Sequence, residues 1–84
     1  MGKEIVIPQG TYTVGEDFPE GNYVFDAMNN HGFIDVYKNG DLGDNECFHL
    51  DEVQGFKCKL CLHNGDCFVI DTQLKVSKAS IFLF

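Results

Sequence analysis

The chain has 84 residues, which is enough for one hydrophobic core and too few for two, so we expect a single domain over residues 1–84. It carries 13 Asp and Glu against 6 lysines and no arginine, giving a formal net charge of −7. A surface of this sign repels phosphate backbones, which argues against direct nucleic-acid binding and favours a basic protein as partner. The sequence has no run of 18 apolar residues and no signal-peptide pattern, so we expect no membrane contact and a cytoplasmic location.

A repeated pattern, apolar-Pro-x-Gly-x-Tyr-x-apolar, occupies the first third of the chain, as IPQGTYTV at residues 7–14 and FPEGNYVF at residues 18–25. Proline presets φ for a turn and the glycine two residues later can adopt positive φ, so each copy predicts a turn followed by a strand. Because side chains alternate along a strand, Tyr23 and Phe25 are expected to share one face.

Glycines then recur at intervals of ten to twelve residues, and the segments between them alternate as strands over residues 32–38, 46–50 and 56–62. The series consists of glycines 10, 21, 32, 43, 55 and 65. This spacing predicts an all-β fold, a small antiparallel β-sandwich or partly open barrel of about 7–8 short strands, with no long helix.

The dipeptide Asn64-Gly65 lies between two apolar runs and predicts a type I′ hairpin that pairs Leu62 with Cys67 and Cys61 with Phe68. Residues 75–77 and 79–84 are expected to supply closing strands. The apolar end Ile81–Phe84 could pair with a second copy to form a homodimer, or close the core against Ile5–Ile7.

The stretch IPQGTYTVGEDFPEGNYVF, residues 7–25, resembles the G-x-Y-x-V-G-x-D-I-P-x-G-x-Y signature of small β modules in Gram-positive bacteria, their phages and lipoprotein-type proteins. Residues 60–70 are more loosely similar to the closing hairpin of that family. The resemblance implies a compact β-sandwich or barrel that recurs as an accessory module without a shared active site. This chain departs from the pattern by carrying Cys61 and Cys67 in the closing segment and by lacking an export signal.

One segment contains residue types that commonly bind zinc, namely Cys58, Cys61, His63 and Cys67. Strand alternation sends Cys58 and Cys61 to opposite faces, and the predicted hairpin register separates Cys61 from Cys67. We therefore expect free thiols, no metal and no cofactor. A zinc-binding or thiol-dependent protein is the alternative.

No catalytic set stands out, because the serines lie in no motif and an acidic chain without arginine offers a thiolate little stabilisation. Recognition through an acidic surface is the remaining use of the carboxylates. The candidate binding residues are Glu16, Asp17, Asp41, Asp44, Glu46, Asp51 and Glu52. Phe48 and Leu50, which lie among them, are either an apolar anchor or core residues of one strand, and alternation favours the core.

These observations predict a non-catalytic protein-binding module. The sharpest version is a small acidic bacterial or phage protein that inhibits a basic, nucleic-acid-binding host protein. A self-assembling accessory module is a second alternative.

Overall fold

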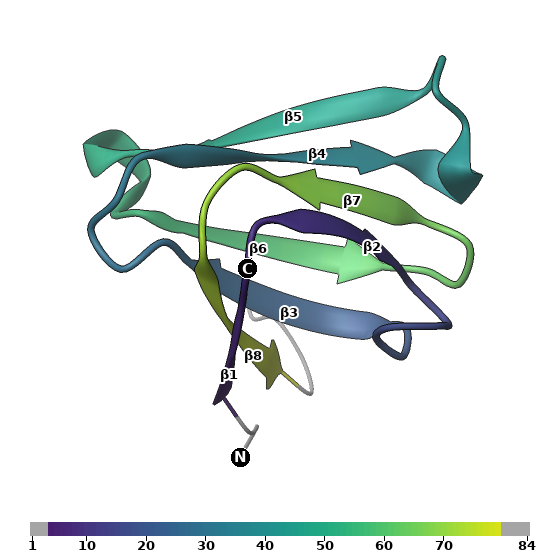
Figure 1. Ribbon diagram of the computed structural model, residues 1–84, viewed down its shortest axis with the longest axis horizontal. Helices are drawn as coiled ribbons and strands as arrows, with labels where there is room; N and C mark the ends of the chain where they lie inside the picture. The colour runs from purple at the N-terminus through teal and green to yellow at the C-terminus, as the bar shows by residue number, and fades with distance from the viewer. Residues whose placement is uncertain (1–3, 80–84) are drawn as a thin grey trace.

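The computed structural model describes residues 4–79, which form two four-stranded antiparallel sheets packed face to face (Figure 1). The strands are β1 (Glu4–Ile7), β2 (Gly10–Thr13), β3 (Gly21–Asp26), β4 (Gly32–Tyr37), β5 (Asn45–Leu50), β6 (Lys57–Leu62), β7 (Cys67–Ile70) and β8 (Leu74–Ala79). The helical segments of this part of the chain are the short 3-10 turns η1 (Lys38–Gly40) and η2 (Glu52–Gln54). The predicted all-β, sandwich-like fold is confirmed. Among residues 4–79, no helix is long and apolar enough to cross a membrane.

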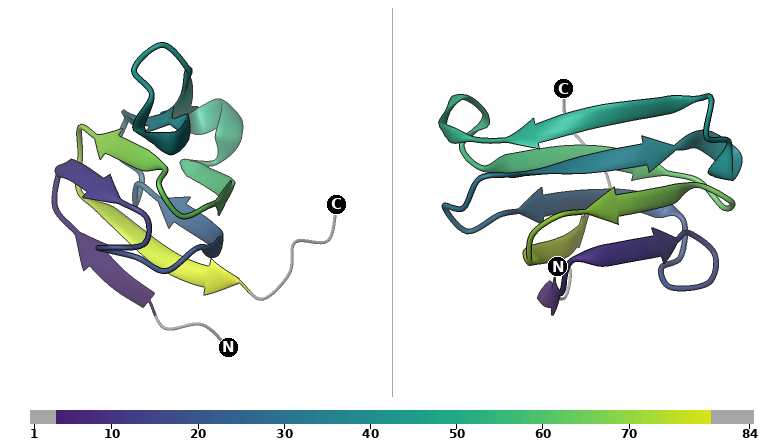
Figure 2. Two further views of the ribbon diagram at one scale, coloured as in Figure 1. Left: turned by 90° about the vertical axis from the view of Figure 1, so that its right-hand side faces the viewer. Right: turned by 45° about the horizontal axis from the view of Figure 1, so that its top comes forward.

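The chain changes sheet at nearly every connection. The first sheet has the order β1-β8-β3-β6 and the second the order β2-β7-β4-β5, so among the strands of residues 4–79 only β4 and β5 are consecutive strands that pair with each other. The edge strands β5 and β6 lie along one open side of the sandwich, and β1 and β2 along the other (Figure 2). Segments distant in sequence therefore meet at both ends of the molecule.

Both copies of the repeated pattern fold in the same way, one in each sheet. Gly10 and Gly21 adopt φ angles of +155° and +154°, which the absence of a side chain permits. The hydroxyl of Tyr12 donates a hydrogen bond to the Pro8 carbonyl oxygen, and Tyr23 does the same to Pro19, each at 2.5 Å. The predicted turn-strand units are confirmed, and each tyrosine fastens its strand to the turn before it.

The regularly spaced glycines separate the strands, as predicted, and each lies at or just before the start of one. They are the first residues of β2, β3 and β4, or lie two residues before β5, β6 and β7. The strands between them alternate, and their inward side chains build one apolar core. Phe68 of β7 is fully buried at its centre, with ring centroids of Tyr12, Phe18 and Phe25 within 5.3–5.8 Å.

The predicted hairpin between β6 and β7 is wrong, because β6 pairs with β3 while β7 pairs with β2 and β4. Residues 63–66 still form a tight turn, closed by the Asp66 N–H donating to the His63 carbonyl at 3.0 Å. Gly65 has a φ of +95°, but Asn64 is not among the residues with positive φ, as a type I′ turn would require. The turn bonds instead to Val14, whose N–H and carbonyl pair with Asp66 and Gly65 at 2.8 and 3.0 Å.

Strand β8 pairs with β1 on one side and β3 on the other, with Ile5 opposite Val76 and Ile7 opposite Leu74. Residues 80–84 lie outside the described part of the chain. The predicted pairing of Ile81–Phe84, with a second copy or with Ile5–Ile7, therefore stays a prediction.

Candidate functional site

Exposed carboxylates gather at one end of the sandwich, which we call the acidic end. The connection between β2 and β3 contributes Glu16, Asp17 and Glu20, and the connection between β4 and β5 contributes Asp41 and Asp44. Both connections and the 63–66 turn lie on the right in Figure 1. Lys38 of η1 and Lys78, whose side chain reaches Gly21, lie here as well. Among residues 4–79, and counting buried Asp66, the acidic end holds six carboxylates against two lysines.

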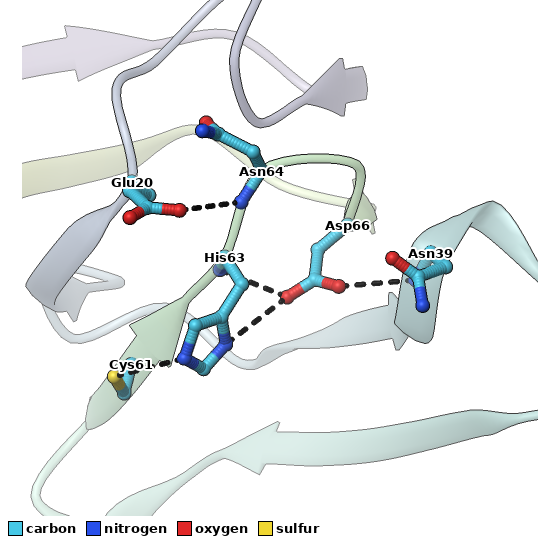
Figure 3. A network of polar contacts seen from close by, with 6 residues as sticks. All are labelled: Glu20, Asn39, Cys61, His63, Asn64 and Asp66. Carbon is cyan, nitrogen blue, oxygen red and sulfur yellow. Dashed lines mark hydrogen bonds and ion pairs between the residues drawn. The ribbon is translucent and has the colours of Figure 1, made fainter.

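Hydrogen bonds through the 63–66 turn hold the acidic end together (Figure 3). On one side, the Asn64 N–H donates to the Glu20 carboxylate at 3.0 Å. On the other side, the Asn39 N–H donates to the Asp66 carboxylate, also at 3.0 Å. The turn thus joins the β2–β3 connection to η1, and the exposed carboxylates are carried by a bonded frame.

Asp66 is the centre of this frame, with only 3% of its surface exposed. Its carboxylate accepts hydrogen bonds from the backbone N–H groups of Asn39 and His63, each at 3.0 Å. Burial by itself raises the pKa of Asp66, but these two N–H groups and the charges of Lys38 and His63 lower it overall. Asp66 is therefore ionised at neutral pH and acts as a fixed negative charge inside the turn.

The structure divides the seven predicted binding residues among three places. Glu16, Asp17, Asp41 and Asp44 lie at the acidic end, Asp51 and Glu52 at the opposite end of β5, and Glu46 on β5 itself. A six-residue strand spans about 20 Å, so one acidic cluster over residues 41–52 does not form. Glu20 and Asp66, which sequence reasoning missed, complete the acidic end.

Several of the predicted carboxylates hold turns. Asp17 accepts from the Thr13 N–H at 2.8 Å, Asp41 from the Gly43 N–H at 2.9 Å, and Asp51 from the Val53 N–H at 3.1 Å. The Glu52 carboxylate bonds to the His31 ring at 2.7 Å, which lowers the pKa of Glu52.

Three other predicted carboxylates do not hold turns. Within the described part of the chain, the side chains of Glu16, Asp44 and Glu46 make no hydrogen bond or ion pair. These three carboxylates are available to a partner at no cost to the fold.

Phe48 and Leu50 do not form an apolar surface anchor. Leu50 is fully buried, and Phe48 is half-buried against the core. The interpretation of both as core residues of one strand is confirmed.

The four possible zinc ligands do not come together in one chain. On β6, Cys58 is packed against the core and Cys61 faces outward, while Cys67 faces outward from the other sheet. Among the described residues, no group of three or more His, Cys, Asp or Glu side chains is arranged to hold a metal ion. The four cysteines carry free thiols. Only Cys61 and His63 of the set are neighbours, with Sγ and Nε2 4.0 Å apart.

An open pocket of about 280 Å³ lies between the edge strands β5 and β6. It is lined by Cys47, Phe48, His49, Gln54, Lys57 and Cys58. Burial, with a contribution from Glu46, raises the pKa of Cys58 to about 11, and burial together with Asp35 raises that of Cys47. Both thiols are thus poor nucleophiles. Sequence reasoning missed this pocket because its walls come from different sheets.

The lysines concentrate on the outer face of the first sheet. Lys57, Lys59 and Lys75 share this face with Glu4 and Asp26, and Lys75 Nζ lies 3.9 Å from a carboxylate oxygen of each. Among the described residues, three lysines and two carboxylates lie on this face, so it carries no excess of carboxylates. The excess negative charge of the chain therefore lies elsewhere, much of it at the acidic end.

Comparison with protein-family models, with curated proteins and with solved structures finds no match for this chain. The resemblance of residues 7–25 to small β modules of Gram-positive bacteria and phages thus stays a prediction, and function is inferred from the molecule's own geometry.

Proposed function

We propose that this chain is a non-catalytic protein-binding module whose acidic end binds a basic protein. The observation that carries the proposal is the gathering of exposed carboxylates from two distant connections on a hydrogen-bonded frame. A backbone held in this way brings the carboxylates of both connections to a partner together, and their combined field speeds encounter with a positive surface.

The partner that fits best is a nucleic-acid-binding protein of a bacterial host. Such proteins bind phosphates through clusters of lysine and arginine, and the acidic end offers anions to the same cationic clusters. Occupying that surface would inhibit nucleic-acid binding. The absence of arginine from this chain, together with its net charge of −7, supports binding to the protein rather than to the nucleic acid.

Support for a non-catalytic role comes from the pocket between β5 and β6. Its two thiols have raised pKa values, and neither is a ready nucleophile near neutral pH. The function proposed for the chain therefore rests on its surface charge.

Affinity capture from a bacterial lysate with the tagged full chain tests the proposal. We expect a basic nucleic-acid-binding protein to be recovered at moderate salt and released at high salt, because exposed charges are screened. The variant Glu16→Gln with Asp44→Asn removes two unbonded carboxylates from the acidic end. Its matched control, Glu4→Gln with Glu52→Gln, makes the same change in net charge at other places on the surface.

The acidic-end variant is expected to lose most of the captured protein and the control to retain it. Equal loss in both variants would mean that net charge, and not the acidic end, drives binding. Recovery of no basic protein by the unmodified chain would refute the proposed function.

A further inference from the structure

Cys61 and His63 lie side by side where β6 runs into the 63–66 turn (Figure 3). The Cys61 Sγ and His63 Nε2 atoms are 4.0 Å apart, and both side chains are exposed. Two zinc-ligand types thus present their binding atoms next to each other on the outside of an edge strand.

The Asp66 carboxylate lies on the Nδ1 side of the His63 imidazole. Its Oδ2 lies 3.8 Å from His63 Nδ1, and the same oxygen accepts the His63 backbone N–H at 3.0 Å. In metal sites, a histidine ligand commonly donates its second ring N–H to a carboxylate, which fixes the ring and directs the other nitrogen at the metal. At 3.8 Å the Asp66 oxygen is too far from Nδ1 for a hydrogen bond, but its negative charge favours the tautomer with the proton on Nδ1, which leaves the Nε2 lone pair on the side of Cys61.

A cysteine, a histidine and an aspartate in this order are also the arrangement in which a histidine activates a nucleophilic thiol. The charge of the protein argues against that use, because a reactive thiolate needs an electropositive setting and this chain has a net charge of −7. Negative charge favours a cation instead, since Glu20 and Asp66 belong to the same turn network. A bound metal ion itself displaces the thiol proton.

We propose that Cys61 and His63 form half of a Cys2His2 zinc site, which the same two residues of a second copy of the chain complete. A tetrahedral zinc ion with ligands at about 2.3 Å for sulfur and about 2.0 Å for nitrogen separates them by about 3.5 Å. Small side-chain rotations bring the observed pair to that spacing. Structural zinc sites take four protein ligands, one chain offers two, and a two-fold axis brings identical residues together. Binding one Zn²⁺ between two chains forms two Zn–S and two Zn–N bonds and releases two thiol protons to water.

The pair Cys47 and His49 provides an internal control. Its Sγ and Nε2 atoms are also 4.0 Å apart on an edge strand. No carboxylate in the described part of the chain lies within ion-pair distance of a ring nitrogen of His49, however, whereas Asp66 lies 3.8 Å from His63 Nδ1. Burial, together with a hydrogen bond and charge from Asp35, raises the pKa of the Cys47 thiol. The two pairs share spacing and a place on an edge strand, so a difference in zinc binding between them is expected from the two features in which they differ, the Asp66 carboxylate beside His63 and the Asp35 carboxylate beside Cys47.

The test uses the full chain, reduced and freed of metal, titrated with Zn²⁺ and with Co²⁺ as a coloured probe, while sedimentation velocity follows its mass. We expect a monomer without metal, a dimer with one Zn²⁺ per two chains, and thiolate charge-transfer absorption with Co²⁺. Cys61→Ser and His63→Gln should each abolish the dimer and the absorption. The double variant Cys47→Ser with His49→Gln should retain both.

Absence of zinc uptake, uptake by a monomer, or a dimer that persists in Cys61→Ser would overturn the proposal. X-ray absorption at the zinc edge reads the ligands of the unmodified protein and so does not depend on how the variants fold. Two sulfur and two nitrogen neighbours are expected, and any other set contradicts the site. This proposal goes beyond binding of a basic protein, since neither set of charge variants used for that function alters Cys61 or His63.

Discussion

The carboxylate of Asp66 accepts a hydrogen bond from the backbone N–H of Asn39, 27 residues earlier in the chain, and so fastens the 63–66 turn to η1. Replacing Asp66 by alanine leaves the N–H groups of Asn39 and His63 without their charged acceptor. We expect Asp66→Ala to lower the free energy of unfolding by about 3 kcal/mol, measured by urea denaturation.

Asp44 supplies the matched control, because its carboxylate is exposed at the same end and makes no hydrogen bond within the described residues. Asp44→Ala is expected to change the free energy of unfolding by less than about 0.5 kcal/mol. If both variants are equally stable, Asp66 does not hold the frame of the acidic end.

The pH dependence of stability provides a second test of Asp66. Its pKa in the folded protein lies below the ordinary value of 3.8, so folding favours the ionised carboxylate. The resulting stabilisation is fully present well above that ordinary value and is lost as the pH falls through the folded pKa. Between about pH 5 and pH 2, the free energy of unfolding should therefore fall more steeply for the unmodified chain than for Asp66→Asn. Parallel curves for the two proteins would show that folding does not lower the pKa of Asp66.

The paired tyrosines permit a comparison within one molecule. Tyr12→Phe and Tyr23→Phe each remove the hydroxyl that donates to a proline carbonyl four residues earlier. We expect each to cost about 1 kcal/mol in urea unfolding, and Tyr23→Phe to cost more because Tyr23 is buried whereas Tyr12 is half-buried. Tyr37→Phe is the control, since the Tyr37 hydroxyl has no hydrogen bond in the described part of the chain. If Tyr37→Phe lowers the free energy of unfolding as much as Tyr23→Phe does, the hydrogen bonds from tyrosine to proline in the repeated pattern do not stabilise the fold.

Local signals in the sequence predicted local structure well. A proline and a glycine at fixed spacing limit φ in the same way wherever they occur, so the two turn-strand units could be predicted. The dipeptide Asn64-Gly65 likewise predicted a chain reversal. It could not predict that β6 and β7 join different sheets, because that choice depends on which distant strands lie beside them. Here β3 pairs with β6, and Val14 takes the backbone bonds of the turn.

The difference between local patterns and long-range pairing also explains which parts of the candidate site could be predicted. Carboxylates close in sequence, from Asp41 to Glu52, were predicted to act together, but the extended strand β5 carries them to opposite ends of the sandwich. Glu20 and Asp66 lie on separate segments of the acidic end, which the hydrogen bonds to Asn64 and Asn39 join. Contacts between residues so far apart in the chain follow from sheet topology and have no signature in a local pattern.

The cysteines differ in a way that thiol chemistry can measure. With a pKa of about 11, Cys58 has only about one thiolate per thousand molecules at pH 8, and its side chain is packed against the core. Cys61, three residues later on the same strand, faces solvent. We expect iodoacetamide, in the presence of a metal chelator, to alkylate Cys61 much faster than Cys58 when each site is followed by mass spectrometry.

Unfolding the chain in urea should remove the difference, since both thiols then have similar surroundings. Equal rates in the folded protein would mean that β6 does not hold Cys58 against the core. Because the alternation of β6 separates the two thiols, that result would also undermine the assignment of Cys61 to the outer face, on which the zinc half-site depends.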